Sequence, residues 1–227
     1  MSSIPPFTFA HPARIVLVGP SGCGKTEFLV RALDLGLFYP KPTRIVWVYG
    51  ESQPAHLRVD ELVEQGKLPK VEYLRNETNY ADLVEGFDPS ENNLLVLDDQ
   101  MSEAKGNIEE FGTVFTKGSH HRNFTVVFLT QNVFEKSFRT SNVNTQYNVL
   151  FNNPRDQLQP AMIARQMFPG MKDFFRDVYQ DATQYPYSYL VLDAHNASPN
   201  ELRLLTNVGA TSAIVYVSPT FADTNLA

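Results

Sequence analysis

The sequence predicts an α/β fold with a mostly parallel central sheet and helices on both faces. Short apolar runs rich in β-branched residues recur along the chain, which is typical of strands buried on both faces. Stretches with helical spacing lie between these runs, and such alternation indicates strand–helix–strand units. Apolar residues make up 43% of the chain, enough to bury a full core, so a disordered chain is excluded.

The predicted elements begin with an extended arm, residues 1–13, followed by one domain over 14–206 and a C-terminal tail, 207–227. The first strand is Arg14–Val18, and a helix follows from about Lys25 to Leu35, with Gly36 as its cap. The further strands are expected at Arg44–Tyr49, Val71–Tyr73, Leu94–Leu97, Phe124–Leu129, Tyr147–Phe151, Tyr187–Leu192 and Glu201–Leu205. The further helices are expected within 54–90 on both sides of Val71–Tyr73, and at Ile108–Lys117, 156–168 and 171–180. Whether the last two strands form a β-hairpin stays open.

Composition excludes several classes of protein. The 19 Lys and Arg residues against 25 Asp and Glu give a net charge of −6, so the chain does not coat nucleic acid by charge alone. One cysteine excludes an intramolecular disulfide and a cysteine-rich zinc site. The longest apolar runs are far shorter than the roughly 20 residues of a membrane helix. We also see no signal peptide, and we expect a soluble intracellular protein with no membrane partner.

A phosphate-binding loop follows the first strand. The segment Gly19–Thr26 fits the pattern G-x-x-x-x-G-K-[ST] at every required position, between a buried strand and a helix. Its residues are Gly19, Pro20, Ser21, Gly22, Cys23, Gly24, Lys25 and Thr26. Glycines let successive N–H groups point at phosphate oxygens, Lys25 is expected on the β- and γ-phosphates, and the Thr26 hydroxyl on Mg²⁺. Cys23 is either a reactive thiol or a small loop residue.

Two carboxylates end a later strand. The run Leu94–Leu97 leads into Asp98 and Asp99, which is the Walker B pattern. Because ligands of open α/β sheets bind at the carboxyl ends of strands, Asp98 is expected to hold Mg²⁺ beside the phosphate loop. Asp99 is then the base that polarises attacking water, with Glu103 as the fallback.

A third polar strand end completes the predicted site. The strand Phe124–Leu129 leads into Thr130 and Gln131, and Gln131 is expected to contact the γ-phosphate or the attacking water. The alternative is a turn residue that satisfies its own backbone. We find no N-K-x-D motif for guanine, so nothing in the sequence specifies GTP.

These segments together resemble the FtsK–HerA branch of P-loop ATPases. The closer likeness is to the DNA-packaging ATPases of Maverick/Polinton elements, adintoviruses, virophages and, more distantly, poxviruses. It is carried by the segments 19–29, 94–101, 115–134, 147–169 and 186–195, which read GPSGCGKTEFL, LLVLDDQM, FTKGSHHRNFTVVFLTQNVF, YNVLFNNPRDQLQPAMIARQMFP and PYSYLVLDAH.

The resemblance implies a RecA-like fold with the strand before Gln131 between the phosphate-loop and Walker B strands. It also implies a homo-oligomeric ring, pentamer or hexamer, that hydrolyses ATP with Mg²⁺ and pumps double-stranded DNA into a preformed capsid. The expected partners are the DNA and a capsid, portal or vertex protein. The expected location is the host cell at sites of virion assembly, in the nucleus or the cytoplasm, or the virion itself.

The resemblance further implies an arginine finger supplied by the neighbouring subunit. Arg122 is the first choice, in the turn before the strand that leads to Gln131, and Arg139 and Arg155 are the alternatives. Two other functions remain open. One is a DNA pump or helicase-like ATPase of a mobile element. The other is a nucleotide-gated scaffold for capsid assembly that barely hydrolyses ATP.

Overall fold

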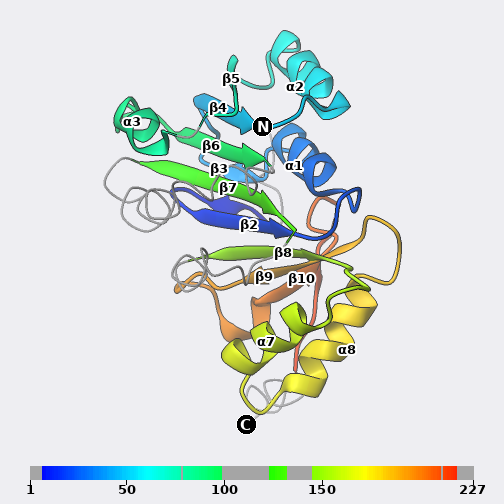
Figure 1. The fold of residues 1–227 in the computed structure, drawn as a ribbon. Helices are drawn as coiled ribbons and strands as arrows, with labels where there is room; N and C mark the ends of the chain where they lie inside the picture. Colours follow the sequence, from blue (N-terminus) through cyan, green and yellow to red (C-terminus); the bar gives the residue numbers. More distant parts are fainter. Residues whose placement is uncertain (1–6, 78, 99–122, 132–144, 211, 219–227) are drawn as a thin grey trace.

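The computed structural model describes residues 7–77, 79–98, 123–131, 145–210 and 212–218. The strands of its main sheet are β2 (Arg14–Val18), β4 (Arg44–Tyr49), β5 (Val71–Arg75), β6 (Asn93–Asp98), β7 (Phe124–Thr130), β8 (Tyr147–Phe151), β9 (Tyr189–Asp193), β10 (Leu204–Thr206) and β11 (Ile214–Val215). They lie in the order β11-β10-β9-β8-β2-β7-β6-β4-β5 (Figure 1). The pairs from β8 to β5 are parallel, and those from β8 to β11 are antiparallel. This is the predicted mostly parallel sheet.

The strand order brings three strand ends together. Strand β7 lies between β2 and β6, which confirms the order that the resemblance implied. Val18 of β2 pairs with Thr130 of β7, and Leu129 of β7 pairs with Asp98 of β6. Because all three strands are parallel, the phosphate loop, Gln131 and the Walker B carboxylate start from one edge of the sheet.

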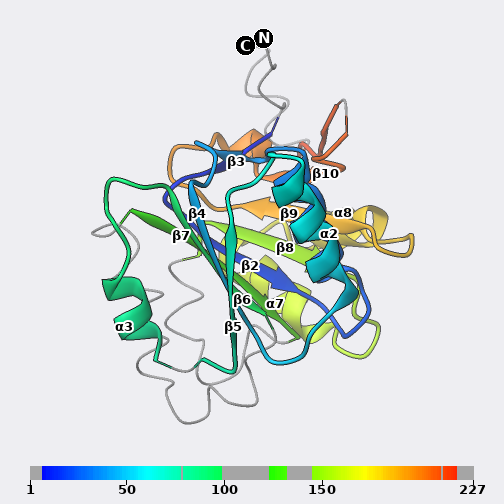
Figure 2. The ribbon, with the colours of Figure 1, turned by 90° about the horizontal axis from the view of Figure 1, so that it is seen from above.

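Helices cover both faces of the sheet, as predicted (Figure 2). The described helices are α1 (Lys25–Asp34), α2 (Pro54–Glu64), α3 (Tyr80–Glu85), α7 (Leu158–Met167) and α8 (Lys172–Ala182). Buried residues of α1 and α2 belong to one apolar cluster, and those of α3, α7 and α8 belong to a second. Strand residues alternate between the clusters: Ile15 and Leu17 of β2 join the first, and Val16 and Val18 join the second. The near-continuous apolar strands therefore reflect burial on both sides.

The ends of α1 and α2 are set by glycines. Gly36 follows α1 with φ +66°, and the N–H groups of Gly36 and Leu37 bond back to the carbonyls of Leu33 and Ala32. Gly66 has φ +69° and closes α2 with the same pair of bonds. This is the Schellman arrangement, in which a left-handed residue satisfies carbonyls that the helix leaves open. The predicted cap at Gly36 is confirmed as the first residue beyond the helix cap.

The N-terminal segment adds a small sheet that the sequence did not predict. Strand β1 (Phe9–Ala10) pairs in parallel with β3 (Phe38–Tyr39). Phe9 is buried and its ring packs edge-on against Phe28 of α1. A two-residue strand has no measurable alternation, so pattern alone could not find it.

The late strands differ from the prediction in their starting points. Tyr187 lies outside β9, because its φ of +65° breaks the extended conformation, and the strand begins at Tyr189. Glu201 belongs to the short 3₁₀ turn η5 (Asn200–Leu202), and β10 begins at Leu204. Strands β9 and β10 pair antiparallel, so the hairpin option is the correct one.

Three further predictions concern the helix expected at Ile108–Lys117, the C-terminal tail and membrane-spanning helices. The helix expected at Ile108–Lys117 lies outside the described residues. Within the segment expected as a tail, β11 adds to the edge of the sheet by pairing with β10. Among the helices described, none has the length and apolar character that crossing a bilayer requires.

Candidate nucleotide-binding site

The phosphate loop connects β2 to α1 at the sheet edge. Gly24 is the N-cap of α1 and adopts φ +104°, a conformation that favours glycine. An added Cβ at Gly24 would also lie 3.1 Å from Cδ1 of Tyr187. With a glycine cap, the first-turn N–H groups of α1 gain no side-chain acceptor, and they remain directed at an incoming anion.

The other end of the loop needs glycine for a different reason. At Gly19, a Cβ would meet Sγ of Cys23 at 2.6 Å and Cβ of Phe151 at 2.8 Å. The loop therefore packs against the end of β8 with no room for a side chain. The Gly19 N–H donates to the Thr130 carbonyl at 3.1 Å, which ties the loop to the end of β7.

Lys25 is folded back onto its own loop. Its Nζ donates to the carbonyl oxygens of Gly19 at 2.6 Å and Pro20 at 3.0 Å. These neutral carbonyls hold the ammonium at the loop without cancelling its charge. The arrangement places a positive charge at the loop, and its contact with phosphate oxygens stays a prediction.

Thr26 and Asp98 face each other across the sheet edge. The Thr26 hydroxyl donates to Oδ2 of Asp98 at 3.5 Å, and Nε2 of Gln53 donates to the same oxygen at 3.2 Å. Asp98 is buried, with 3% of its surface exposed. One hydroxyl and one carboxylate are the hard oxygen ligands that Mg²⁺ takes from proteins alongside phosphates and water. The residues present fit a Mg²⁺ ion at the place the sequence predicted.

Gln131 reaches the phosphate loop. Its Nε2 donates to the Ser21 hydroxyl at 3.5 Å, so the side chain lies beside the loop. The backbone carbonyl of Gln131 accepts a hydrogen bond from Nε2 of the buried Gln159, which also donates to Oδ2 of Asp156 at 2.7 Å. The end of β7 is thereby connected to α7.

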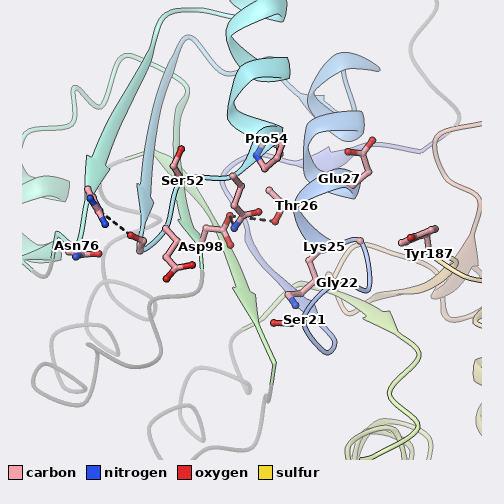
Figure 3. Close-up of a pocket in the computed structure, with 16 residues that line it drawn as sticks. Ser21, Gly22, Lys25, Thr26, Glu27, Ser52, Pro54, Asn76, Asp98 and Tyr187 are labelled. Atoms are coloured by element: carbon pink, nitrogen blue, oxygen red, sulfur yellow. Dashed lines mark hydrogen bonds between the residues drawn. The ribbon is translucent and has the colours of Figure 1, made fainter.

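A cavity of about 760 Å³ is lined by Lys25, Thr26, Gln53 and Asp98, and Gln131 is not among its lining residues. Figure 3 shows Lys25, Thr26 and Asp98 around it, with Ser52 and Asn76 on one side and Tyr187 on the other. Its lining residues are Ser21, Gly22, Gly24, Lys25, Thr26, Glu27, Gly50, Glu51, Ser52, Gln53, Pro54, Ala55, Arg75, Asn76, Asp98 and Tyr187. The volume is in the range of small-molecule sites.

Cys23 has the properties of a structural loop residue. Burial raises the pKa of its thiol, and this outweighs the opposing effect of the nearby Lys25 ammonium. A raised pKa leaves less thiolate at neutral pH, so the thiol is a weaker nucleophile than a free cysteine. The structure favours the small loop residue over the reactive thiol.

The structure brings together the residues of the phosphate loop, Asp98 and Gln131, and a second group of predicted residues lies outside the described part of the chain. Asp99, Glu103, Arg122 and Arg139 belong to that second group. Arg155 is described and lies exposed on the loop that follows β8.

The sequence alone did not single out two polar residues of the cavity wall. Glu51 and Gln53 follow β4, whose last residue pairs with Asp98. Their signal was available: polar residues directly after a parallel strand lie at the ligand-binding edge of the sheet. The proline at the first position of α2 marks where this short connection ends.

The chain is similar in fold to solved ATPase structures. The cytoplasmic domain of the type VII secretion ATPase EccC from Thermomonospora curvata matches 91% of this chain with a TM-score of 0.50 and 15% identity. The chain spans 25% of the EccC chain. No protein-family model and no curated protein matches the sequence.

Two further solved structures are similar at lower scores. The genome packaging NTPase B204 of Sulfolobus turreted icosahedral virus 2, in complex with ATPγS, has 12% identity and a TM-score of 0.47, covering 90% of this chain and 96% of its own. The KaiC-like protein PH0186 from Pyrococcus horikoshii OT3 has 13% identity and a TM-score of 0.47, covering 90% and 89%. At these identities the likeness concerns the fold. The chain has the α/β fold of RecA-like P-loop ATPases.

Proposed function

We propose that the chain is an ATP-hydrolysing motor that moves double-stranded DNA into a preformed capsid. One observation carries the ATPase part. The phosphate loop, Lys25 and the Thr26–Asp98 pair converge on one cavity at the carboxyl edge of the sheet. The packaging part is supported by the sequence resemblance, above all by the segments 115–134 and 147–169. Host-cell location at sites of virion assembly belongs to the same proposal.

Phosphate binding follows from the loop geometry. Backbone N–H groups of the loop and of the first turn of α1 surround the β- and γ-phosphates. Lys25 exchanges its two carbonyl partners, Gly19 and Pro20, for phosphate oxygens. A charged acceptor makes a stronger hydrogen bond to an ammonium than a neutral carbonyl does, so this exchange is favourable.

Thr26 and Asp98 would hold Mg²⁺ in the proposed complex, where the ion would supply positive charge against the phosphates. Gln53 keeps Oδ2 of Asp98 turned toward Thr26 through its hydrogen bond of 3.2 Å. Because Asp98 is buried, its orientation is set before the nucleotide arrives.

Water activation is assigned to Asp99, the second Walker B carboxylate. Glu51 is an alternative base, because it lines the cavity beside the phosphate loop and closely follows β4, the strand that neighbours β6. Gln131 contacts the γ-phosphate in the proposed complex, and its hydrogen bond to Ser21 of the phosphate loop supports this role. Its backbone carbonyl accepts a hydrogen bond from Gln159, which connects the end of β7 to α7.

The test measures ATP hydrolysis against protein concentration, with and without linear duplex DNA. We expect turnover per chain to rise steeply with concentration, since the proposed ring completes each site at a subunit interface, and to rise again with DNA. Lys25→Ala removes phosphate binding. Asp99→Asn keeps nucleotide binding and loses turnover, whereas Glu51→Gln keeps both if Asp99 is the base.

Two outcomes redirect the proposal. Nucleotide binding with negligible turnover that ignores DNA and concentration favours the capsid-assembly scaffold. A mobile-element DNA pump is favoured if the wild-type protein shows DNA-stimulated turnover and a virus that carries Lys25→Ala still packages its genome normally. The DNA-packaging motor requires DNA stimulation and the loss of packaged genomes in that virus.

A further inference from the structure

A second hollow lies on the other side of the phosphate loop. Its volume is about 380 Å³, and it shares Gly22 and Tyr187 with the cavity that holds Lys25 and Asp98. The remaining lining residues are Cys23, Phe151, Asn152, Thr183, Gln184, Tyr185, Pro186 and Ser188. The two hollows are therefore neighbours that meet at Gly22 and Tyr187.

Tyr187 has an unusual backbone for its side chain. Its φ is +65°, and the other described non-glycine residues with positive φ are all asparagines. A bulky residue rarely adopts this conformation. A turn holds it in place: the Ser188 hydroxyl donates to the Tyr185 carbonyl at 2.7 Å, and the Ser188 N–H donates to the same oxygen at 3.1 Å.

The Tyr187 ring is held against the loop and is also open to solvent. Its Cδ1 lies 3.1 Å from where a Cβ on Gly24 would stand, yet 70% of the residue is exposed. Tyr185, on the same turn, is 69% exposed. Two exposed aromatic rings bordering a hollow beside a phosphate site offer flat surfaces for stacking a nucleobase.

The direction of a bound nucleotide selects this hollow. The groups suited to the γ-phosphate and Mg²⁺, Gln131 and the Thr26–Asp98 pair, lie toward β7 and β6. The nucleoside is attached at the other end of the phosphate chain, so it must lie on the side of the loop opposite to β7 and β6. Figure 3 shows Tyr187 on the side of Lys25 that faces away from Asp98.

We propose that the Tyr187 side of the phosphate loop is the nucleoside subsite, where the Tyr187 ring stacks on the purine of the bound nucleotide. The inference rests on the proposed nucleotide binding and adds the residue that holds the base by stacking. Stacking acts on ATP and leaves inorganic tripolyphosphate, which has no base, unaffected.

The experiment compares the affinities of Mg·ATP and Mg·tripolyphosphate by calorimetry. Tyr187→Asn removes the ring while supplying a residue that accepts positive φ. We expect ATP affinity to fall about tenfold or more in this variant, with tripolyphosphate affinity changed less than about twofold. Tyr187→Phe keeps the ring and is expected to keep the affinity for ATP. Tyr39→Asn, at an exposed tyrosine that lines neither hollow, is the matched control.

The outcomes separate this inference from the proposed function. If wild type binds neither ligand, nucleotide binding itself is wrong. If Lys25→Ala loses both ligands while Tyr187→Asn keeps ATP affinity, the site stands and the base subsite is wrong. An equal loss of ATP and tripolyphosphate in Tyr187→Asn means that Tyr187 only supports Gly24, which also overturns the proposal. If Tyr187→Asn does not fold, Tyr187→Gly replaces it, because glycine also accepts positive φ, and the ratio of ATP loss to tripolyphosphate loss decides.

Discussion

At the scale of single residues, the phosphate loop is constrained from two sides. Gly24 is required by its backbone conformation, and Gly19 by lack of space. Lys25 needs both constraints, because its Nζ donates to the carbonyl of Gly19 at the start of the loop while its own backbone begins α1. Substituting either glycine would therefore move the Lys25 ammonium, the group proposed to bind phosphate.

Gly19→Ala is expected to destabilise the protein by about 1–3 kcal/mol, the usual cost of overpacking. The added methyl would lie 2.6 Å from Sγ of Cys23 and 2.8 Å from Cβ of Phe151. Urea unfolding measures the change in free energy. The double variant Gly19→Ala with Cys23→Ala should recover only part of it, because Phe151 remains. Gly66→Ala, where no atom lies within 4 Å of the added Cβ, reports backbone strain without a clash. An unchanged unfolding free energy for Gly19→Ala would contradict the predicted packing.

Gln53→Glu tests how Asp98 is held. The wild-type amide donates to Oδ2 of Asp98, and the substitution replaces a donor with a second negative charge. We expect the metal-free protein to lose about 1–3 kcal/mol of stability, the usual cost of removing a hydrogen bond to a charged group. Mg²⁺ alone should then raise the thermal midpoint of the variant more than that of wild type. A midpoint that rises equally in both would show that Gln53 does not act on the metal site.

At the scale of elements, α2 is held to the sheet by an aromatic cluster around His56. The imidazole lies 5.4 Å from the Trp47 ring, 4.9 Å from the Tyr49 ring and 5.2 Å from the Tyr73 ring, centroid to centroid. Burial lowers the pKa of His56 from 6.5, and this outweighs the opposing charge of Asp60. The start of α2 forms part of the cavity wall, so this cluster supports the site.

His56→Phe is expected to make stability less sensitive to acid. Because the folded-state pKa is lowered, the unfolded chain takes up a proton first as the pH falls below about 6.5, so the stability present above that pH is progressively lost. Phenylalanine keeps the ring and does not titrate. The difference in unfolding free energy between variant and wild type should be constant above pH 7. Below about pH 6.5 the variant should become more stable relative to wild type. A difference that does not change with pH would contradict the lowered pKa.

The sequence predicted the elements that follow strong patterns. The β-branched runs and the loop Gly19–Thr26 were found because local residue types determine them. The pair β1–β3 and the start of β9 were not, because two residues have no period and Tyr187 looks like part of the following strand. The bond from Gln53 to Asp98 joins residues 45 positions apart, and only the register of β4 against β6 brings them together.

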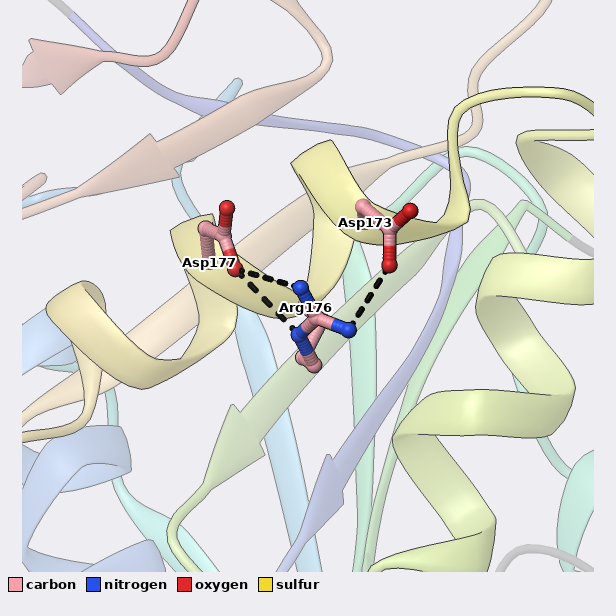
Figure 4. A network of polar contacts seen from close by, with 3 residues as sticks. All are labelled: Asp173, Arg176 and Asp177. Atoms are coloured by element: carbon pink, nitrogen blue, oxygen red, sulfur yellow. Dashed lines mark hydrogen bonds and ion pairs between the residues drawn. The ribbon is translucent and has the colours of Figure 1, made fainter.

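At the scale of the whole molecule, the proposed ring must complete its site with a residue from a neighbouring chain. Charge pairing helps to choose a control arginine. Figure 4 shows Arg176 of α8 held by two carboxylates of its own helix, with hydrogen bonds to Asp173 at 2.7 Å and to Asp177 at 3.1 Å. Such exposed pairs contribute little to stability, but they occupy the guanidinium. Arg155, which no described ion pair includes, stays available on its exposed loop.

A mixing experiment decides which arginine acts across the interface. Lys25→Ala has no working phosphate loop, and Arg122→Ala is expected to lack the finger, so each variant alone should be inactive. In an equimolar mixture, roughly a quarter of head-to-tail interfaces join an intact loop to an intact arginine. We therefore expect mixing to restore part of the turnover.

The same mixture with Arg139→Ala or Arg155→Ala tests the alternative fingers, and Arg176→Ala should be active without mixing. If Arg122→Ala is inactive and its mixture stays inactive, Arg122 acts within its own chain or in folding, and the finger is one of the other two. If every arginine variant is active alone, the site is complete within one chain. The steep dependence of turnover on protein concentration should then disappear as well, because assembly would no longer supply any catalytic group.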